Sequence, residues 1–179
     1  MFKNPFQVAV TFALVGLILK ITVFALGIQH GTMETYVWYL FMLLLLCTVF
    51  FGIRSNKVNF EGTTSLGQDF KTGARSASFF GILMGAITYI YYAQIDPDFF
   101  PIKQQPYLDG LIEIAKSKIE EGVSKEEVVK GLYESTARVK LQLSPYLHSM
   151  LTMFGLVFIG LFNSIVFAFL LKKFPGFKK

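Results

Sequence analysis

Cysteine, histidine and charged residues are scarce in this 179-residue sequence. Cys47 is the only cysteine, which excludes an intrachain disulfide framework and any zinc or redox site built on paired cysteines. The two histidines, His30 and His148, form no Ser/His/Asp pattern, and the sequence has neither a nucleophile elbow nor a phosphate-binding glycine loop. Only 16% of the residues are charged. We therefore expect a protein that has no catalytic residues and binds no cofactor.

Apolar residues are abundant instead. The sequence is 53% hydrophobic with a mean hydropathy of +0.51, too apolar for one soluble core of this size. Apolar stretches cover about 6–28, 37–53, 77–95 and 146–171, and each is close to the roughly 20 residues that a helix needs to cross a bilayer. We expect an all-α, integral membrane four-helix bundle, with 1–179 forming one domain and 96–144 an external helical insertion.

The basic residues predict how the chain is oriented. The formal net charge is +5, but no basic stripe with interleaved aromatics indicates nucleic-acid binding. By the positive-inside rule, both termini are cytoplasmic and 96–144 is periplasmic in a bacterial inner membrane. The basic residues that carry this prediction are Lys3, Arg54, Lys57, Lys71, Arg75, Lys172, Lys173, Lys178 and Lys179. Aromatic residues at the predicted outer ends agree, namely Tyr36, Trp38, Tyr39, Tyr89, Tyr91, Tyr92 and Tyr146.

The insertion has the pattern of two amphipathic helices separated by residues 121–124. The first is predicted to start near Pro106 and to end at Gly122, with apolar residues at helical spacing. Ser124 and Glu127 have the spacing of a capping box for the second helix. Because each helix has one apolar face, the pair must pack on each other, on the membrane surface or on a partner. The segment carries nine acidic and seven basic residues, which favours self-packing or a partner over the membrane surface.

Two further capping patterns lie at the ends of predicted spans. Ser65 and Gln68 have capping-box spacing, so a helix is expected to start at Ser65 and continue into the third span. Ser144 and Pro145 are typical of a helix start and open the fourth span.

Three segments resemble an uncharacterised membrane protein family of Bacteroidota, domain of unknown function 4199 (DUF4199). The resemblance covers nearly the whole chain. It implies a small four-span inner-membrane protein and brings no catalytic residues to carry over. The segments are Gly52-Ile53-Arg54, Ser65-Leu66-Gly67-Gln68-Asp69-Phe70-Lys71-Thr72-Gly73 and Tyr91-Tyr92-Ala93-Gln94-Ile95-Asp96-Pro97-Asp98-Phe99.

Lys20 lies inside the first predicted span. A charge there costs about 2.5–3.5 kcal/mol on insertion scales. A long lysine side chain can reach the membrane surface at the outer end of this span, or it can pair with another group. It can also contribute to an ion or ligand site. No acidic residue lies inside the other predicted spans, which weighs against a proton-coupled transporter.

Small residues recur at four-residue spacing in the third and fourth spans. Such ridges let two helix backbones approach closely. They pack either on each other within one chain or against a second protein, and Asn163 beside the second ridge is able to hydrogen-bond across either interface. The ridges are Gly73, Ala77, Gly81 and Gly85 in one span and Gly160, Ser164 and Ala168 in the other.

A metal site is a weak alternative at the predicted outer side. Nitrogen and oxygen ligands there would have to converge from distant segments, namely His30, Glu34, Asp96, Asp98 and His148. The segment Asp96-Pro97 is explained more simply as a helix cap followed by a first-turn proline. We expect no metal.

These patterns favour a non-enzymatic accessory or assembly subunit of an inner-membrane complex. The expected partners are membrane lipid and either another inner-membrane protein or a second copy of the chain. The ridges would supply the contact in the membrane, and the helical insertion the contact outside it. The alternative is a small homo-oligomeric transporter or channel lined by Lys20. A role in assisting a membrane glycosyltransferase or lipid-handling enzyme rests on size and topology alone.

Overall fold

The computed structural model describes residues 2, 4–31, 33–60 and 63–173, and these residues contain helices and no strand. Lys3, Lys178 and Lys179, used above for orientation, lie outside them. The elements are α1 (Pro5–Ala25), α2 (Met33–Asn59), α3 (Leu66–Ile90), a π-helical segment η1 (Tyr91–Ile95), α4 (Phe99–Glu120), α5 (Lys125–Gln142) and α6 (Pro145–Lys173).

Four helices in the described part of the chain are long and apolar enough to cross a membrane, namely α1, α2, α3 with η1, and α6. The predicted all-helical class and the four candidate spans are therefore confirmed. Two of these helices extend beyond the predicted spans, because α2 continues to Asn59 and α3 already begins at Leu66. Hydropathy detects only the apolar middle of a helix, whereas the polar turns at its ends are helical as well.

Side chains cap three of the helix starts. Asn4 accepts a hydrogen bond from the backbone N–H of Gln7 and caps α1. At the start of α3, Ser65 Oγ accepts from the N–H of Gln68 while Gln68 Oε1 accepts from the N–H of Ser65, which confirms the predicted capping box. Ser144 Oγ accepts from the N–H of Leu147, so the predicted cap of α6 is confirmed.

Three predictions for the insertion are wrong. Ser124 precedes α5 but makes no side-chain capping hydrogen bond. Helix α4 begins at Phe99 instead of near Pro106, and its N-cap residue is Asp98, not Asp96. A proline inside a helix removes one backbone hydrogen bond, and α4 continues through Pro106.

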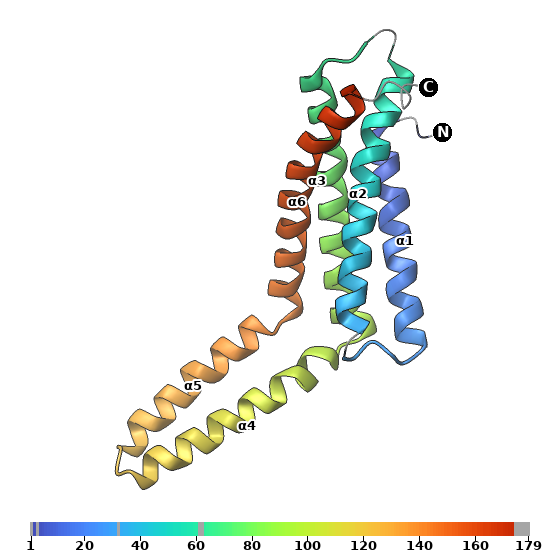
Figure 1. Cartoon of the computed structure of the whole chain (residues 1–179). Coiled ribbons are helices and arrows are strands. Elements are labelled where there is room, and N and C mark those ends of the chain that lie inside the picture. The colour runs from blue at the N-terminus through green and yellow to red at the C-terminus, as the bar shows by residue number, and fades with distance from the viewer. Residues whose placement is uncertain (1, 3, 32, 61–62, 174–179) are drawn as a thin grey trace. The chain divides into compact units, whose positions relative to one another are not determined.

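The chain divides into two compact units, which we describe separately. The first comprises the described residues of 1–87 and 150–179, and in it α1, α2, most of α3 and most of α6 lie side by side (Figure 1). α1 begins and α6 ends at the same end of this unit (Figure 1). Its core is filled by large apolar side chains, among them Phe41, Leu45, Val49, Phe80, Met84 and Leu156.

The second unit, Thr88–Ser149, contains η1, α4 and α5. Helices α4 and α5 form an antiparallel pair (Figure 1), joined at a turn where Gly122 has a φ of +89°, so this residue ends α4 as expected. At the base of the pair, the amide of Gln104 donates to the carbonyl of Leu143 over 2.6 Å.

A cluster of rings lies next to η1 in the second unit. The ring of Tyr92 contacts those of Phe99, Phe100 and His148, with centroid distances of 4.5–5.2 Å. The hydroxyl of Tyr91 donates a hydrogen bond to Asp96. Tyr91 and Tyr92 are both buried.

Candidate functional site

The small-residue ridges of α3 and α6 lie against each other within the chain. A Cβ atom on Gly73 would lie 2.9 Å from Ser164 Oγ. A Cβ on Gly160 would overlap the Cβ of Ala77, and one on Gly81 would lie 2.7 Å from a methyl carbon of Val157. The two backbones therefore approach as closely as small residues permit.

The remaining ridge residues are buried as well. Gly85 is buried on α3, and Ala168 is fully buried on α6. Ser164 Oγ donates to the carbonyl of Gly160 in its own helix over 2.7 Å, which satisfies this hydroxyl without a partner. The α3–α6 seam is thus an internal packing surface of the first unit.

Asn163 does not bond across this seam. Its side-chain amide donates to the carbonyl of Ile159, one turn earlier in α6, over 2.8 Å. Within the described chain, this amide thus bonds to its own helix, and a bond to a second protein stays a prediction. Polar side chains in apolar helices often bond to their own backbone in this way.

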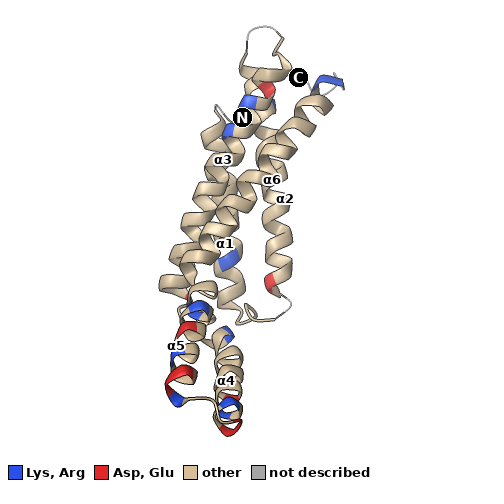
Figure 2. Ribbon diagram, turned by 90° about the vertical axis from the view of Figure 1, so that its left-hand side faces the viewer, with Lys and Arg blue, Asp and Glu red and all other residues tan. Residues whose placement is uncertain are grey.

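Lys20 lies on the inner face of α1. The buried residues of this helix are Val8, Ala9, Ala13, Gly16 and Lys20, which recur at helical spacing and form one stripe. A Cβ on Gly16 would contact Met84 and Leu44, so the stripe faces α2 and α3. Figure 2 shows a basic band on α1, away from the basic bands at the end of the first unit where α1 begins. Only 6% of Lys20 is exposed.

A buried ion pair joins α2 to the start of α3. Lys57 Nζ lies 2.5 Å from Asp69 Oδ2, and both side chains are at least nine-tenths buried. Lys57 also donates to the hydroxyl of Thr64 over 2.9 Å. Removing one partner of such a pair leaves an uncompensated buried charge and costs about 3–5 kcal/mol. The pair therefore fixes the α2–α3 connection.

The same two helices meet at another close contact. Ser76 on α3 is fully buried, and its Oγ has no hydrogen-bond partner within the described residues. A Cβ atom on Gly52 would overlap this hydroxyl. Gly52, Lys57, Asp69 and Gln68 thus come from, or lie next to, the first two sequence segments that carry the family resemblance. The structure gives these segments a role in joining α2 to α3.

A cavity of about 520 Å³ opens beside this ion pair in the first unit. Its lining includes lysines from two helices, three hydroxyl residues and one amide. Charged and hydrogen-bonding side chains therefore make up most of its described lining. No local sequence pattern indicates this cavity, because its residues come from three segments. They are Lys57, Phe60, Thr63, Thr64, Ser65, Gln68 and Lys172.

The weak metal hypothesis gains no support from the geometry. Within the described residues, no three His, Cys, Asp or Glu side chains come together in a way that could hold a metal ion. His148 contacts the rings of Tyr92 and Phe100, and Asp96 accepts a hydrogen bond from Tyr91. Cys47 is half-buried on α2 and is a free thiol.

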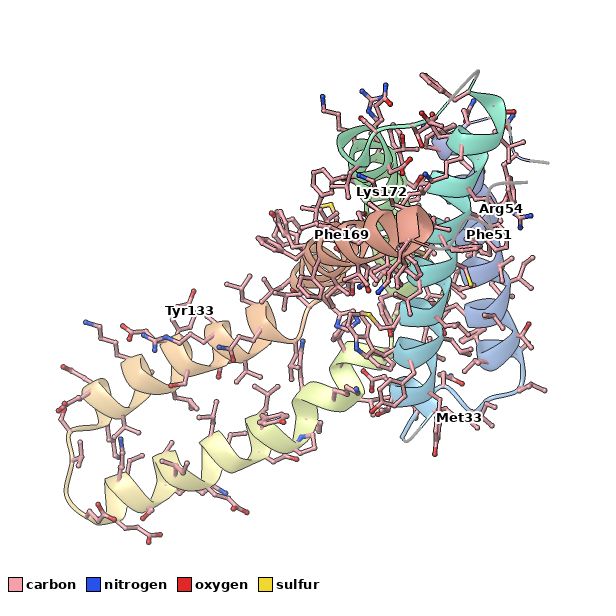
Figure 3. The ribbon with its side chains drawn as sticks, turned by 45° about the horizontal axis from the view of Figure 1, so that its top comes forward. Met33, Phe51, Arg54, Tyr133, Phe169 and Lys172 are labelled. Carbon is pink, nitrogen blue, oxygen red and sulfur yellow. The ribbon has the colours of Figure 1, made fainter. Side chains whose placement is uncertain are left out.

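The α4–α5 pair has almost no core of its own. Among residues 101–144, all of which the structure describes, Val128 is the only buried residue. A shallow groove of about 320 Å³ runs between the helices and is lined by Leu111, Ile114 and Leu132, among others. Several large apolar side chains remain exposed, namely Ile102, Tyr107, Ile112, Ile114, Ile119, Val129, Tyr133 and Leu141. Figure 3 shows Tyr133 extending from α5 away from α4.

Comparison with known proteins gives one family. The model of a family described as protein of unknown function (DUF4199) matches residues 7–173. No curated protein and no solved structure matches this chain significantly.

Proposed function

Because the chain belongs to the DUF4199 family, whose description assigns no activity, we propose a function from the structure itself: a non-enzymatic accessory or assembly subunit of a bacterial inner-membrane complex. The main observation behind this proposal is the small core of the α4–α5 pair, in which one residue between 101 and 144 is buried. Fully burying one Val, Leu, Ile or Phe side chain contributes only about 1.5–3 kcal/mol. Such a pair gains stability from a surface that covers its exposed apolar side chains.

In this proposal the α4–α5 pair lies on the periplasmic side and docks on a partner protein. Val129 and Tyr133 follow each other at four-residue spacing on α5 and are 62% and 76% exposed. Exposed apolar residues outside a bilayer mark protein or membrane contacts. The acidic balance of 96–144 favours a protein over an anionic membrane surface. The α3–α6 ridges are occupied within the chain, so the partner contact is assigned to α4 and α5 alone.

The experiment is extraction of the tagged protein from its native membrane in a mild detergent, with mass and composition of the recovered particle measured by mass spectrometry. We expect a foreign protein at fixed stoichiometry. Val129→Glu and Tyr133→Glu should each release it, because a charge then has to be buried in the contact. Gln142→Glu is the control, since it adds the same charge at an exposed polar position of the same helix.

Recovery of the chain alone, or only as copies of itself, would contradict the accessory function. Retention of the partner by both Val129→Glu and Tyr133→Glu would contradict the assigned surface. Loss of the partner in all three variants would show that added charge acts without regard to position.

Lys20 supports a second candidate, a small homo-oligomeric transporter or channel. A charge that is buried on the inner face of a span is a functional-site hypothesis in a membrane protein. In liposomes containing the purified chain, Lys20→Met should abolish ion or solute flux if Lys20 lines a path. Under the accessory function, the wild-type chain conducts nothing and Lys20→Met retains the partner.

A further inference from the structure

We propose that the cavity formed by Lys57, Thr63, Thr64, Ser65, Gln68 and Lys172 binds a phosphate group of an anionic ligand. Its lining combines residues of α2, the α2–α3 connection, α3 and α6, all in the first unit. Figure 3 shows Lys172 near the end of α6 and Arg54 near the end of α2. A volume of about 520 Å³ is within the range of small-molecule sites and exceeds what one phosphate group needs.

The lining offers several hydrogen-bond donors, and three of its side-chain oxygens already accept one hydrogen bond each within the chain. Thr64 Oγ1 accepts from Lys57, Ser65 Oγ accepts from the N–H of Gln68, and Gln68 Oε1 accepts from the N–H of Ser65. The two hydroxyl groups and the side-chain amide can still donate two hydroxyl hydrogens and two amide hydrogens. Thr63 adds a third hydroxyl. A site of this composition favours a ligand that accepts several hydrogen bonds.

The charges of the lining favour an anion. An ammonium has three N–H donors, and Asp69 and Thr64 take two of those on Lys57. Lys172 is a second cation, from another helix, and it makes no ion pair within the described residues. Among the residues that the structure describes, none that lines the cavity is acidic. The cavity also adjoins the first turn of α3, whose backbone N–H groups attract negative charge.

The position of the cavity favours a lipid headgroup as the source of the phosphate. Lys57 follows the apolar part of α2 and Lys172 follows that of α6, so both lie where a candidate span ends. Basic residues at such positions attract anionic lipids. Phe60 supplies an apolar wall. A free phosphate compound has the same recognition chemistry and is the other source.

The test uses the full-length chain reconstituted in vesicles of phosphatidylcholine and phosphatidylglycerol in equal parts, released and analysed by native mass spectrometry. We expect phosphatidylglycerol to be retained in preference to phosphatidylcholine. Lys172→Met should lower this preference about tenfold, since it removes a charged hydrogen-bond donor. Thr63→Val, which leaves the capping box intact, should lower it by a smaller factor.

Lys173→Met is the matched control, because Lys173 is the neighbouring basic residue and does not line the cavity. It should change the preference by no more than about twofold. Equal retention of the two lipids by the wild type, or equal effects of Lys172→Met and Lys173→Met, would overturn the proposal.

A second arm separates the two sources. Inorganic phosphate is added to the chain in lipid-free detergent, and the unfolding temperature is followed through the fluorescence of Trp38. If the site prefers a lipid headgroup, inorganic phosphate leaves this temperature unchanged while phosphatidylglycerol is retained. A rise that depends on Lys172, without selective lipid retention, would overturn the lipid source and assign the cavity to a free phosphate compound.

Discussion

Glycine residues in the first unit differ in what a side chain would meet. A Cβ on Gly160 would overlap Ala77, whereas a Cβ on Gly67 would meet nothing within 4 Å. Both residues are helical, so neither backbone conformation requires a glycine. The difference between them lies in the packing of α3 on α6.

A matched pair of substitutions separates these effects. Gly160→Ala should destabilise the chain by about 1–3 kcal/mol, because the added methyl group forces the two backbones apart. Gly67→Ala should stabilise it by up to about 1 kcal/mol through helix propensity. Unfolding of both variants and the wild type in mixed micelles at increasing dodecyl sulfate measures the two effects. Equal stability of the two variants would show that the α3–α6 seam is not closely packed.

Residue patterns in the sequence identified the seam but not its polar neighbours. Gly73, Ala77 and Gly81 recur at four-residue spacing, which places them on one face of a helix. The ion pair of Lys57 with Asp69 is not visible in this way. Twelve positions separate the two residues, and only the path of the α2–α3 connection brings them together.

At the scale of whole elements, Gly110 and Gly122 offer a second comparison. Gly110 is inside α4, and Gly122 has a φ of +89° in the turn that follows it. A Cβ on either would meet nothing within 4 Å, so only the backbone distinguishes them. An L-residue in the left-handed region costs roughly 1–2 kcal/mol.

We therefore expect Gly122→Ala to weaken the α4–α5 pair and Gly110→Ala to strengthen it by up to about 1 kcal/mol. Amide hydrogen exchange of residues 101–142, measured in detergent, reports on both. Faster exchange in Gly122→Ala and slower exchange in Gly110→Ala would agree with the structure. A Gly122→Ala variant that exchanges like the wild type would show that the turn does not hold this conformation in solution.

The sequence predicted the helices with strong apolar patterns and missed features that depend on neighbours. The four candidate spans and the capping residues Ser65 and Ser144 follow from local rules. The π-helical segment Tyr91–Ile95 does not, because nothing in the local pattern distinguishes it from the end of α3. The start of α4 was placed too late, since a proline is more common in the first turn of a helix than further inside.

For the whole molecule, the orientation in the membrane is the property on which the proposed function depends. It rests on lysines and arginines at the ends of the four candidate spans. The sole cysteine, Cys47, makes a direct measurement possible. In a Cys47→Ser background, one new cysteine at Ser124 and, separately, one at Thr63 place a label on either side. Both positions are exposed.

In intact cells with a permeabilised outer membrane, a maleimide that cannot cross the inner membrane should label Ser124→Cys and spare Thr63→Cys. After the inner membrane is opened, both should be labelled, which controls for the reactivity of each thiol. The reverse pattern would place the α4–α5 pair in the cytoplasm. A periplasmic partner for Val129 and Tyr133 would then be excluded, whereas the cavity at Lys57 and Lys172 would face the periplasmic leaflet and its proposed ligand would have to come from there.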